Sequence, residues 1–248
     1  MNINPKTNPQ RDAVLLAQQT RVVGPNSALM RNYKDSLPNL DLFQLGLCVG
    51  VLLGDAAIAP NQAVTQLTHR LKFEWGGKNQ EYAQHVYDML SLYCLTGLRT
   101  QVRVNAKNNE VTTWCFQTVS VPAFNILAIA FLSGGKKVLD IHALADMITP
   151  VSLAYWFMDD GGSVMNNRYT LHLHTQGFTH EEVLALCGIL KNKFDLDCWV
   201  GSKASKKHKP FIVISGHSYT KFFQLVAPHI IPSMRYKFPT GSRTQWQD

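Results

Sequence analysis

The fold of this 248-residue chain is decided by Leu45-Gly-Leu-Cys-Val-Gly-Val-Leu-Leu-Gly-Asp55 and by Leu153-Ala-Tyr-Trp-Phe-Met-Asp-Asp160. Both stretches are almost wholly apolar until an aspartate closes them. A helix that is apolar on every side belongs in a protein interior. We therefore predict two buried helices, each of which ends in an acid.

Three glycines in the first stretch predict how the two helices meet. Gly46, Gly50 and Gly54 recur every four residues, so they share one face of the predicted helix. Each costs the helix about 1 kcal/mol relative to alanine. Close approach of a second backbone would offset that cost. We expect the second helix to pack there, with Tyr155 and Trp156 supplying bulk opposite the glycines.

The closing acids, Asp55 and Asp160, indicate a cation site. A helix C-terminus carries about half a negative charge and unpaired carbonyls, so a carboxylate there is unfavourable. A bound cation removes the conflict, and carboxylate oxygens suit Mg²⁺, Mn²⁺ or Ca²⁺. No cysteine or histidine pair lies nearby to favour zinc. The alternative is that both acids simply end their helices at a wet surface.

The order of predicted elements occurs twice along the chain. The first series is a helix over Asp41–Gly54 capped by Asn39, strand-like segments around Gln66–Trp75, a helix over Asn79–Cys94, strands Thr100–Val104 and Val111–Val119, a helix over Pro122–Leu132, and Lys137. The second is a helix from Thr149-Pro150 to Met158, a strand over Tyr169–Gln176, a helix over Thr179–Phe194, strands Cys198–Gly201 and Phe211–Ser215, a helix over Ser218–Val226, and Lys237.

This repeat indicates a duplicated gene and hence a monomer. Asp55 and Lys137 are 82 positions apart, and Asp160 and Lys237 are 77 apart (137 − 55 and 237 − 160). We divide the chain into an N-terminal arm over 1–24, a first half over 25–146 and a second half over 147–248.

Composition narrows the class of protein. Lysine and arginine number 24 against 17 aspartates and glutamates, a net charge of +7 that favours a polyanionic partner such as nucleic acid. The five cysteines form no C-x-x-C pair, so we expect free thiols in a reducing compartment. No run reaches the roughly 18 apolar residues of a membrane span. The polar stretch Met1–Val23 is expected to be a disordered arm, with a weak transit peptide as the alternative.

The two motifs and several shorter segments resemble those of a known protein family. Val49-Gly-Val-Leu-Leu-Gly-Asp55 and Leu153–Gly161 resemble the two motifs of the single-chain LAGLIDADG homing endonucleases, and Ser152–Gly162 is most like a member encoded in a mitochondrial intron. The similarity extends to Gly24-Pro-Asn-Ser27, Phe73-Glu-Trp75, Thr175-Gln176 and Asn192-Lys-Phe194. It therefore covers most of the chain after about Gly24. Tyr155 stands where many members have glycine, and Ala56 replaces the glycine that closes the first motif.

The resemblance implies a fold and a set of site residues. The expected fold class is α+β, with two pseudo-symmetric αββαββα halves packed through their motif helices and two saddle-shaped antiparallel sheets facing DNA. The eighth motif position, Asp55 or Asp160, binds metal, and the carbonyls of Gly54 and Asp159 could assist. The central basic residues map to Lys137 and Lys237, which would polarise water or stabilise developing charge.

Recognition of DNA is expected along the strands, because a two-stranded ribbon fits the major groove. In Tyr169–Gln176, Leu171 and Leu173 would face the core and alternate residues would face DNA. The candidate DNA-binding residues are Arg99, Arg103, Lys107, Arg168, His172, His174, Gln176, Lys203, Lys206 and Lys207. Alternatively, His172 and His174 could bind a metal as a pair. The basic turn Lys203–Lys209 could likewise be a solvated loop with no DNA contact.

Taken together, these features predict a metal-dependent, site-specific double-strand DNA endonuclease of intron homing. Adjacent helix ends reach closely spaced phosphates across the minor groove, so we expect short 3′ overhangs. We expect Mg²⁺ as cofactor, with Mn²⁺ substituting and Ca²⁺ binding without supporting cleavage. The family implies an organelle-intron product that is not secreted. The alternatives are an intron splicing maturase that binds RNA, a catalytically inactive DNA-binding module and a duplicated aspartic protease; the last needs no basic surface.

Overall fold

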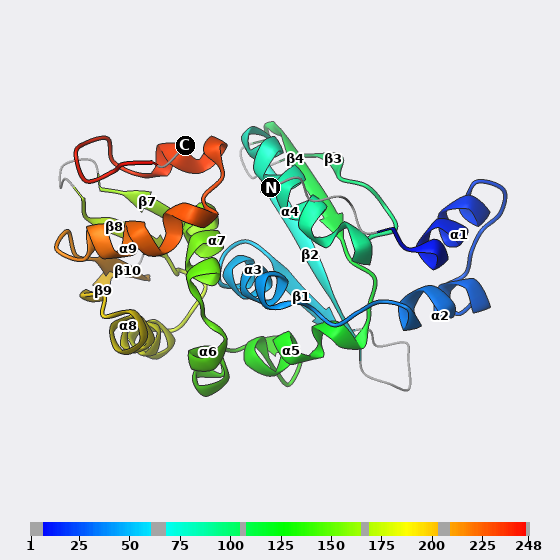
Figure 1. Cartoon of the computed structure of the whole chain (residues 1–248), viewed down its shortest axis with the longest axis horizontal. Helices are drawn as coiled ribbons and strands as arrows, with labels where there is room; N and C mark the ends of the chain where they lie inside the picture. The colour runs from blue at the N-terminus through cyan, green and yellow to red at the C-terminus, as the bar shows by residue number, and fades with distance from the viewer. Residues whose placement is uncertain (1–6, 61–67, 105–107, 165–168, 203–208, 247–248) are drawn as a thin grey trace. The chain divides into compact units, whose positions relative to one another are not determined.

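The computed structural model describes residues 7–60, 68–104, 108–164, 169–202 and 209–246 as an α+β protein with two four-stranded antiparallel sheets (Figure 1). The first sheet has the order β1-β2-β4-β3 and the second β7-β8-β10-β9. The strands of the first sheet are β1 (Ala57–Pro60), β2 (His69–Gly76), β3 (Arg99–Val104) and β4 (Glu110–Gln117). Those of the second sheet are β7 (Gly161–Ser163), β8 (Leu171–His174), β9 (Cys198–Ser202) and β10 (Pro210–Ile214). The predicted fold class is confirmed.

The helices complete an αββαββα series in each repeat. The first contains α3 (Leu42–Leu53), α4 (Gln80–Leu90) and α5 (Asn125–Phe131), and the second contains α7 (Pro150–Asp160), α8 (His180–Phe194) and α9 (Tyr219–Val226). Outside the series lie α1 (Pro9–Gln18), α2 (Ala28–Asp35), α6 (Ile141–Met147) and the short strands β5 (Leu132–Ser133) and β6 (Lys136–Lys137). The 3-10 helices within the described residues are η1 (Gly77–Asn79), η2 (Ser91–Tyr93), η3 (Pro122–Phe124), η5 (Ala227–His229) and η6 (Pro232–Lys237).

By packing, the chain forms two compact units whose limits differ from those of the repeat. The first unit joins Met1–Gln44 with Ala57–Ala128, and the second joins Leu45–Ala56 with Ile129–Asp248. Most of α3 therefore belongs to the same unit as α7. The division into an arm and two halves describes the repeat and remains a prediction.

The first unit is built on its sheet. Alternate residues of β2 are buried, and Phe73 stacks on Phe116 of β4 with ring centroids 4.3 Å apart. The helix α4 packs on β2 and β4. The N-terminal helices α1 and α2 pair around Val14, Met30 and Tyr33, all buried. The expectation of a disordered arm was therefore wrong for Pro9–Gln18.

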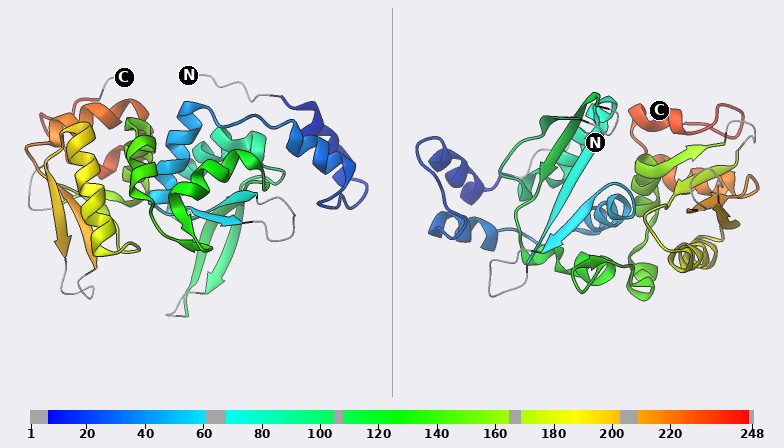
Figure 2. Two further views of the ribbon diagram at one scale, coloured as in Figure 1. Left: turned by 90° about the horizontal axis from the view of Figure 1, so that it is seen from below. Right: turned by 180° about the vertical axis from the view of Figure 1, so that it is seen from behind.

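The second unit is built on the second sheet. The helices α7 and α8 pack on the strands, and α9 packs on α7 (Figure 2). Leu171 and Leu173 of β8 are fully buried, as the alternating pattern predicts. The five cysteines are free thiols. Among the described residues, no helix combines the length and apolar character needed to cross a membrane.

The residues at the helix starts differ in how well the sequence indicates them. Thr149 and Thr179, with which the predicted helices begin, cap α7 and α8, each within a capping box. Asn39 was wrong as the cap of α3. Asp41 fills that role instead, because its Oδ1 accepts a hydrogen bond of 2.8 Å from the N–H of Gln44.

Candidate active site and nucleic-acid interface

The glycine face of α3 lies directly against α7, as expected. A Cβ atom on Gly50 would lie 2.5 Å from the carbonyl oxygen of Ser152 and 2.7 Å from Cβ of Tyr155. A Cβ atom on Gly46 would lie 2.8 Å from Oγ1 of Thr149. The two backbones therefore approach more closely than any side chain at these positions would allow.

This contact brings the C-terminal ends of both helices together. The backbone N–H of Asp55 donates to Oδ2 of Asp159 over 3.2 Å. A Cβ atom on Gly54 would lie 2.5 Å from Cβ of the same Asp159. The chain turns out of α7 at Gly161, where a Cβ atom would overlap Phe157. Asp55 and Asp160 thus occupy the same end of one helix pair.

The two lysines predicted from the repeat also lie at this end. Nζ of Lys237 donates to the carbonyl oxygens of Asp159, at 2.7 Å, and of Phe157, at 3.5 Å. Lys137 lies on β6 of a two-stranded hairpin, where it pairs with Leu132. Gly134 and Gly135 form its turn with φ of 57° and 76°, values that favour glycine.

The charges of these groups interact. Burial, and after it the nearby charge of Asp55, raise the pKa of Asp160 to about 7 against the opposing charges of Lys237 and Lys137. The pKa of Asp55 is also raised by burial, again against the two lysines. Burial lowers the pKa of each lysine, and the aspartates counter it.

We expect Asp160→Asn to raise the free energy of unfolding of the metal-free protein at about pH 8. The folded pKa of about 7 exceeds the ordinary 3.8, so ionising this carboxyl opposes folding. The penalty is absent below about pH 4, grows up to about pH 7 and is complete above that. Urea unfolding in a chelating buffer should show a stability gap over the wild type that closes as pH falls. A gap that is constant across this pH range would contradict the assignment.

The donor atoms at this end fit a hard divalent cation. They are carboxylate and carbonyl oxygens, the ligands that Mg²⁺ and Ca²⁺ take. Within the described ranges, no group of three or more His, Cys, Asp or Glu side chains could hold a metal. A protein that offers two carboxylates leaves the remaining positions to water and substrate phosphate, as Mg²⁺ sites commonly do. The histidines of β8 are likewise not gathered into a metal site, and Nδ1 of His174 hydrogen-bonds Gln176 at 3.0 Å.

The first sheet carries a basic face. Arg99 and Arg103 lie on β3, and both are exposed. Arg99 is opposite Cys115, which is opposite Glu74, so these residues share one face. Arg103 forms an ion pair of 2.8 Å with Glu74. The register adds two cations that the sequence analysis missed, Arg70 and Lys72 on β2, although their alternation with buried Leu71 and Phe73 was a usable signal.

The second sheet carries histidines and an aromatic residue on one face. His172 and Trp199 both lie opposite Val213, and His174 lies opposite Phe211. His172 contacts the Phe211 ring edge-on, with centroids 4.9 Å apart. Trp199, which is 49% exposed, was also missed. Five predicted DNA-binding residues lie outside the described residues: Lys107, Arg168, Lys203, Lys206 and Lys207.

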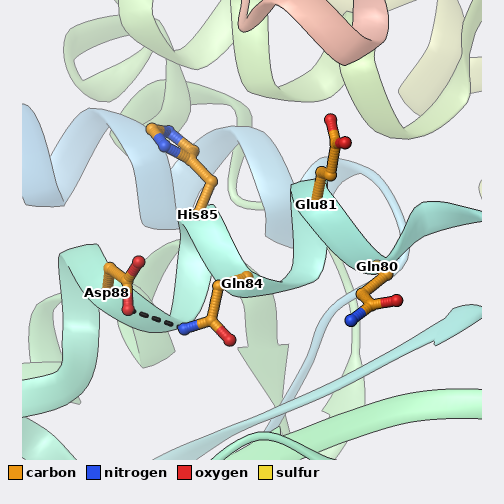
Figure 3. A pocket seen from close by; sticks show the side chains of 5 residues that line it. All are labelled: Gln80, Glu81, Gln84, His85 and Asp88. Atoms are coloured by element: carbon orange, nitrogen blue, oxygen red, sulfur yellow. Dashed lines mark hydrogen bonds between the residues drawn. The ribbon is translucent and has the colours of Figure 1, made fainter.

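A separate pocket of about 490 Å³ lies on α4 (Figure 3). Its lining residues are Gln80, Glu81, Gln84, His85 and Asp88. Nε2 of Gln84 donates to Asp88 over 2.7 Å, and burial lowers the pKa of His85. Two acids and a histidine that favours its neutral form make this pocket a poor match for a phosphate.

Comparisons with known proteins place the chain in a family. The profile of the "LAGLIDADG DNA endonuclease family" matches residues 45–222. The "Probable intron-encoded endonuclease 1" of Wickerhamomyces canadensis is 39% identical over 219 residues, which are 87% of this chain and 92% of that protein. The "Cytochrome b mRNA maturase bI2" of Debaryomyces hansenii is 29% identical over 203 residues, 80% of this chain and 74% of the relative.

One solved structure is similar over nearly the whole chain. It is that of the homing endonuclease I-WcaI bound to its DNA recognition sequence, with a TM-score of 0.81 and 35% identity. The match covers 94% of this chain and 99% of the other.

Proposed function

Because the chain belongs to the LAGLIDADG DNA endonuclease family, we propose that it is a homing endonuclease that cuts both strands of a long DNA site. The observation that carries this proposal is the meeting of Asp55 and Asp160 at one end of the α3–α7 pair, beside two lysines. A carboxylate pair with balancing ammonium groups is suited to phosphodiester chemistry, where charge develops on phosphate and leaving oxygens.

We propose that Asp55 and Asp160 hold divalent metal, assisted by the carbonyls of Gly54 and Asp159. A bound cation would supply an activated water and neutralise charge at the scissile phosphate. The protein groups have complementary tasks. Lys237 is held by two α7 carbonyls, so its Nζ can present a proton to a phosphate oxygen from a fixed position. Lys137 would do the same for the other strand.

The sheet faces would read the DNA. On the first sheet we propose Arg70, Lys72, Arg99 and Arg103 as contacts, and on the second His172, His174 and Trp199, with Gln176 at the end of β8. Arginine and lysine suit phosphates and guanine edges, whereas histidine and tryptophan suit base edges and sugars. Lys107, Arg168, Lys203, Lys206 and Lys207 remain predicted contacts. The site length expected for two sheets is roughly 15 to 18 base pairs.

Cleavage should leave short 3′ overhangs, because paired helix ends reach phosphates across the minor groove. We expect Mg²⁺ to support cleavage, Mn²⁺ to substitute for it, and Ca²⁺ to permit binding alone. The duplicated fold is expected to act as a monomer. The intron-encoded relatives support an origin within an intron, and an organelle remains the predicted location.

A second candidate function is splicing of the host intron as a maturase. The similarity to the Debaryomyces hansenii maturase favours it, and the same basic faces could bind RNA. The presence of an acid in both motifs favours DNA cleavage, since RNA binding alone needs neither Asp55 nor Asp160.

The proposal is tested by selecting cleaved molecules from a randomised duplex library in Mg²⁺. We expect one long site to be enriched, with each strand cut once and the cuts offset toward the 3′ side. Parallel reactions in Mn²⁺ and Ca²⁺ test the order of the metals. Binding to intron RNA with no cleavage of any duplex in either Mg²⁺ or Mn²⁺ would favour the maturase instead.

A further inference from the structure

Lys137 lies on a hairpin that has little burial of its own to fix it. All residues from Ser133 to Val138 are exposed, and the hairpin is held by the pairing of two residues on each strand and by backbone hydrogen bonds of Val138 to Phe131 and of Asp140 to Ala130. These bonds fix the backbone, but an ammonium on a four-carbon side chain remains conformationally free unless neighbours restrict it. Efficient catalysis requires the opposite, because misplacing a reacting group by about 1 Å can cost on the order of a hundredfold in rate.

Contacts from the start of α8 restrict the hairpin. Nζ of Lys137 lies 5.2 Å from the ring centroid of Phe178, within the range of a cation–π interaction. The backbone N–H of Leu139, two residues on, donates to Oε1 of Glu182 over 2.9 Å. The other carboxylate oxygen of Glu182 accepts from the backbone N–H of Thr179 over 2.8 Å. One carboxylate therefore ties the hairpin to the N-terminus of α8.

We propose that Glu182 and Phe178 are positioning residues for Lys137, through which the second repeat sets the active lysine of the first. This inference rests on the proposed nuclease function. Glu182 fixes the backbone beyond Lys137, and Phe178 supplies a surface for its ammonium. Neither residue needs to touch DNA for this role.

The other lysine is held by different means. Lys237 donates to carbonyl oxygens at the end of α7, and the described contacts of Glu182 and Phe178 do not include it. Each lysine would serve one strand, so a defect at Glu182 should slow only one of the two cuts. A general loss of stability would slow both cuts in parallel, which makes strand-resolved rates a direct readout of positioning.

The test uses the full-length protein and a duplex of its selected site, with a different fluorophore on each strand. Lys137→Ala first identifies the strand that depends on Lys137. Glu182→Gln is expected to slow that strand on the order of tenfold and the other by less than about twofold. Leu139 and Thr179 donate to different oxygens of Glu182, so glutamine in the same position would set its NH₂ group against one of these two backbone N–H donors.

Glu181→Gln is the matched control, since it removes the same charge from the same helical turn. Glu181 is exposed and makes no described contact with the hairpin. We expect wild-type rates on both strands. Thermal unfolding of all variants shows whether each is folded at the assay temperature.

Phe178 gives an independent second variant. Phe178→Leu keeps an apolar side chain but removes the aromatic face, so it should slow the same strand as Glu182→Gln. Phe178→Tyr retains that face and should restore the rate. A wild-type protein that cuts neither strand would refute the proposed function. If the wild type cuts both strands normally, two results would overturn the positioning role and leave the proposed function standing. One is that Glu182→Gln changes the cleavage rates of both strands equally, or of neither. The other is that Lys137→Ala slows the cleavage of both strands alike.

Discussion

Asp55→Asn and Asp160→Asn are each expected to abolish double-strand cleavage while leaving DNA binding in place. The rate on the strand served by the altered acid should fall on the order of 100- to 1,000-fold, as when one preorganised electrostatic group is lost. Asparagine keeps the size of aspartate but loses the charge that holds a cation. The measurement is a strand-resolved cleavage assay in Mg²⁺, with binding measured separately in Ca²⁺.

Asp195→Asn is the matched control for these substitutions. Asp195 also lies at a helix C-terminus, as the C-cap of α8, and its carboxylate accepts from Lys221 at the surface. Its φ is 51°, a conformation that asparagine adopts readily. This variant should cut both strands at wild-type rates. Full cleavage by Asp55→Asn or by Asp160→Asn would remove the acids from the mechanism.

Gly50→Ala is expected to lower the free energy of unfolding by about 3 kcal/mol. The added methyl would lie 2.5 Å from the Ser152 carbonyl and 3.0 Å from the Trp156 nitrogen, both backbone atoms that cannot rotate away. The helices must separate to accept it, and that movement also displaces Asp55 from Asp160. We therefore expect cleavage to fall together with stability. Urea or thermal unfolding measures the first effect.

Gly188→Ala is the matched control, and we expect it to raise the free energy of unfolding, whereas Gly50→Ala lowers it. Gly188 lies within α8, and a Cβ atom there would meet nothing within 4 Å. Alanine should stabilise the helix by up to about 1 kcal/mol, because glycine is the poorer helix former. If both variants had the same effect, the close approach of α3 and α7 would not be the reason for the glycine at position 50.

The motif helices were predictable because their signals are redundant. Length, apolar character and glycine spacing all specify that α3 and α7 are buried and packed on one another. The alternation in Leu171–His174 likewise determined which side chains face the core. The placement of Lys137 and Lys237 depended on comparing the two repeats, since neither lysine is distinctive in its local sequence.

Other elements left weak signals. The strand β1 is four residues long and ends in Pro60, which is tolerated because β1 is an edge strand. The pair Gly134-Gly135 turns the hairpin that carries Lys137, and the sequence analysis did not predict the two short strands of that hairpin. Asn39 resembled a helix cap, but Asp41 and Gln44 form the local pair that begins α3.

The remaining features of the site depend on tertiary contacts, which the sequence does not indicate. The side chain of Asp159 accepts from Asp55, and its carbonyl accepts from Lys237, but nothing in its sequence position indicated either contact. Glu182 was recognisable as an acid in the first turn of α8. That the same carboxylate also holds Leu139 follows only from the fold. The N-terminal arm over 1–24 is polar on average, yet Val14 of its helix α1 is buried in a cluster with Met30 and Tyr33 of α2.

The most direct test of the account is Mn²⁺ binding by the protein–DNA complex, followed by the loss of the free-ion signal in electron paramagnetic resonance. The same duplex without protein provides the background. We expect the wild-type complex to take up Mn²⁺ and the double variant Asp55→Asn with Asp160→Asn to bind it at least about tenfold more weakly. Equal uptake by both complexes would contradict the claim that this pair of acids holds the metal.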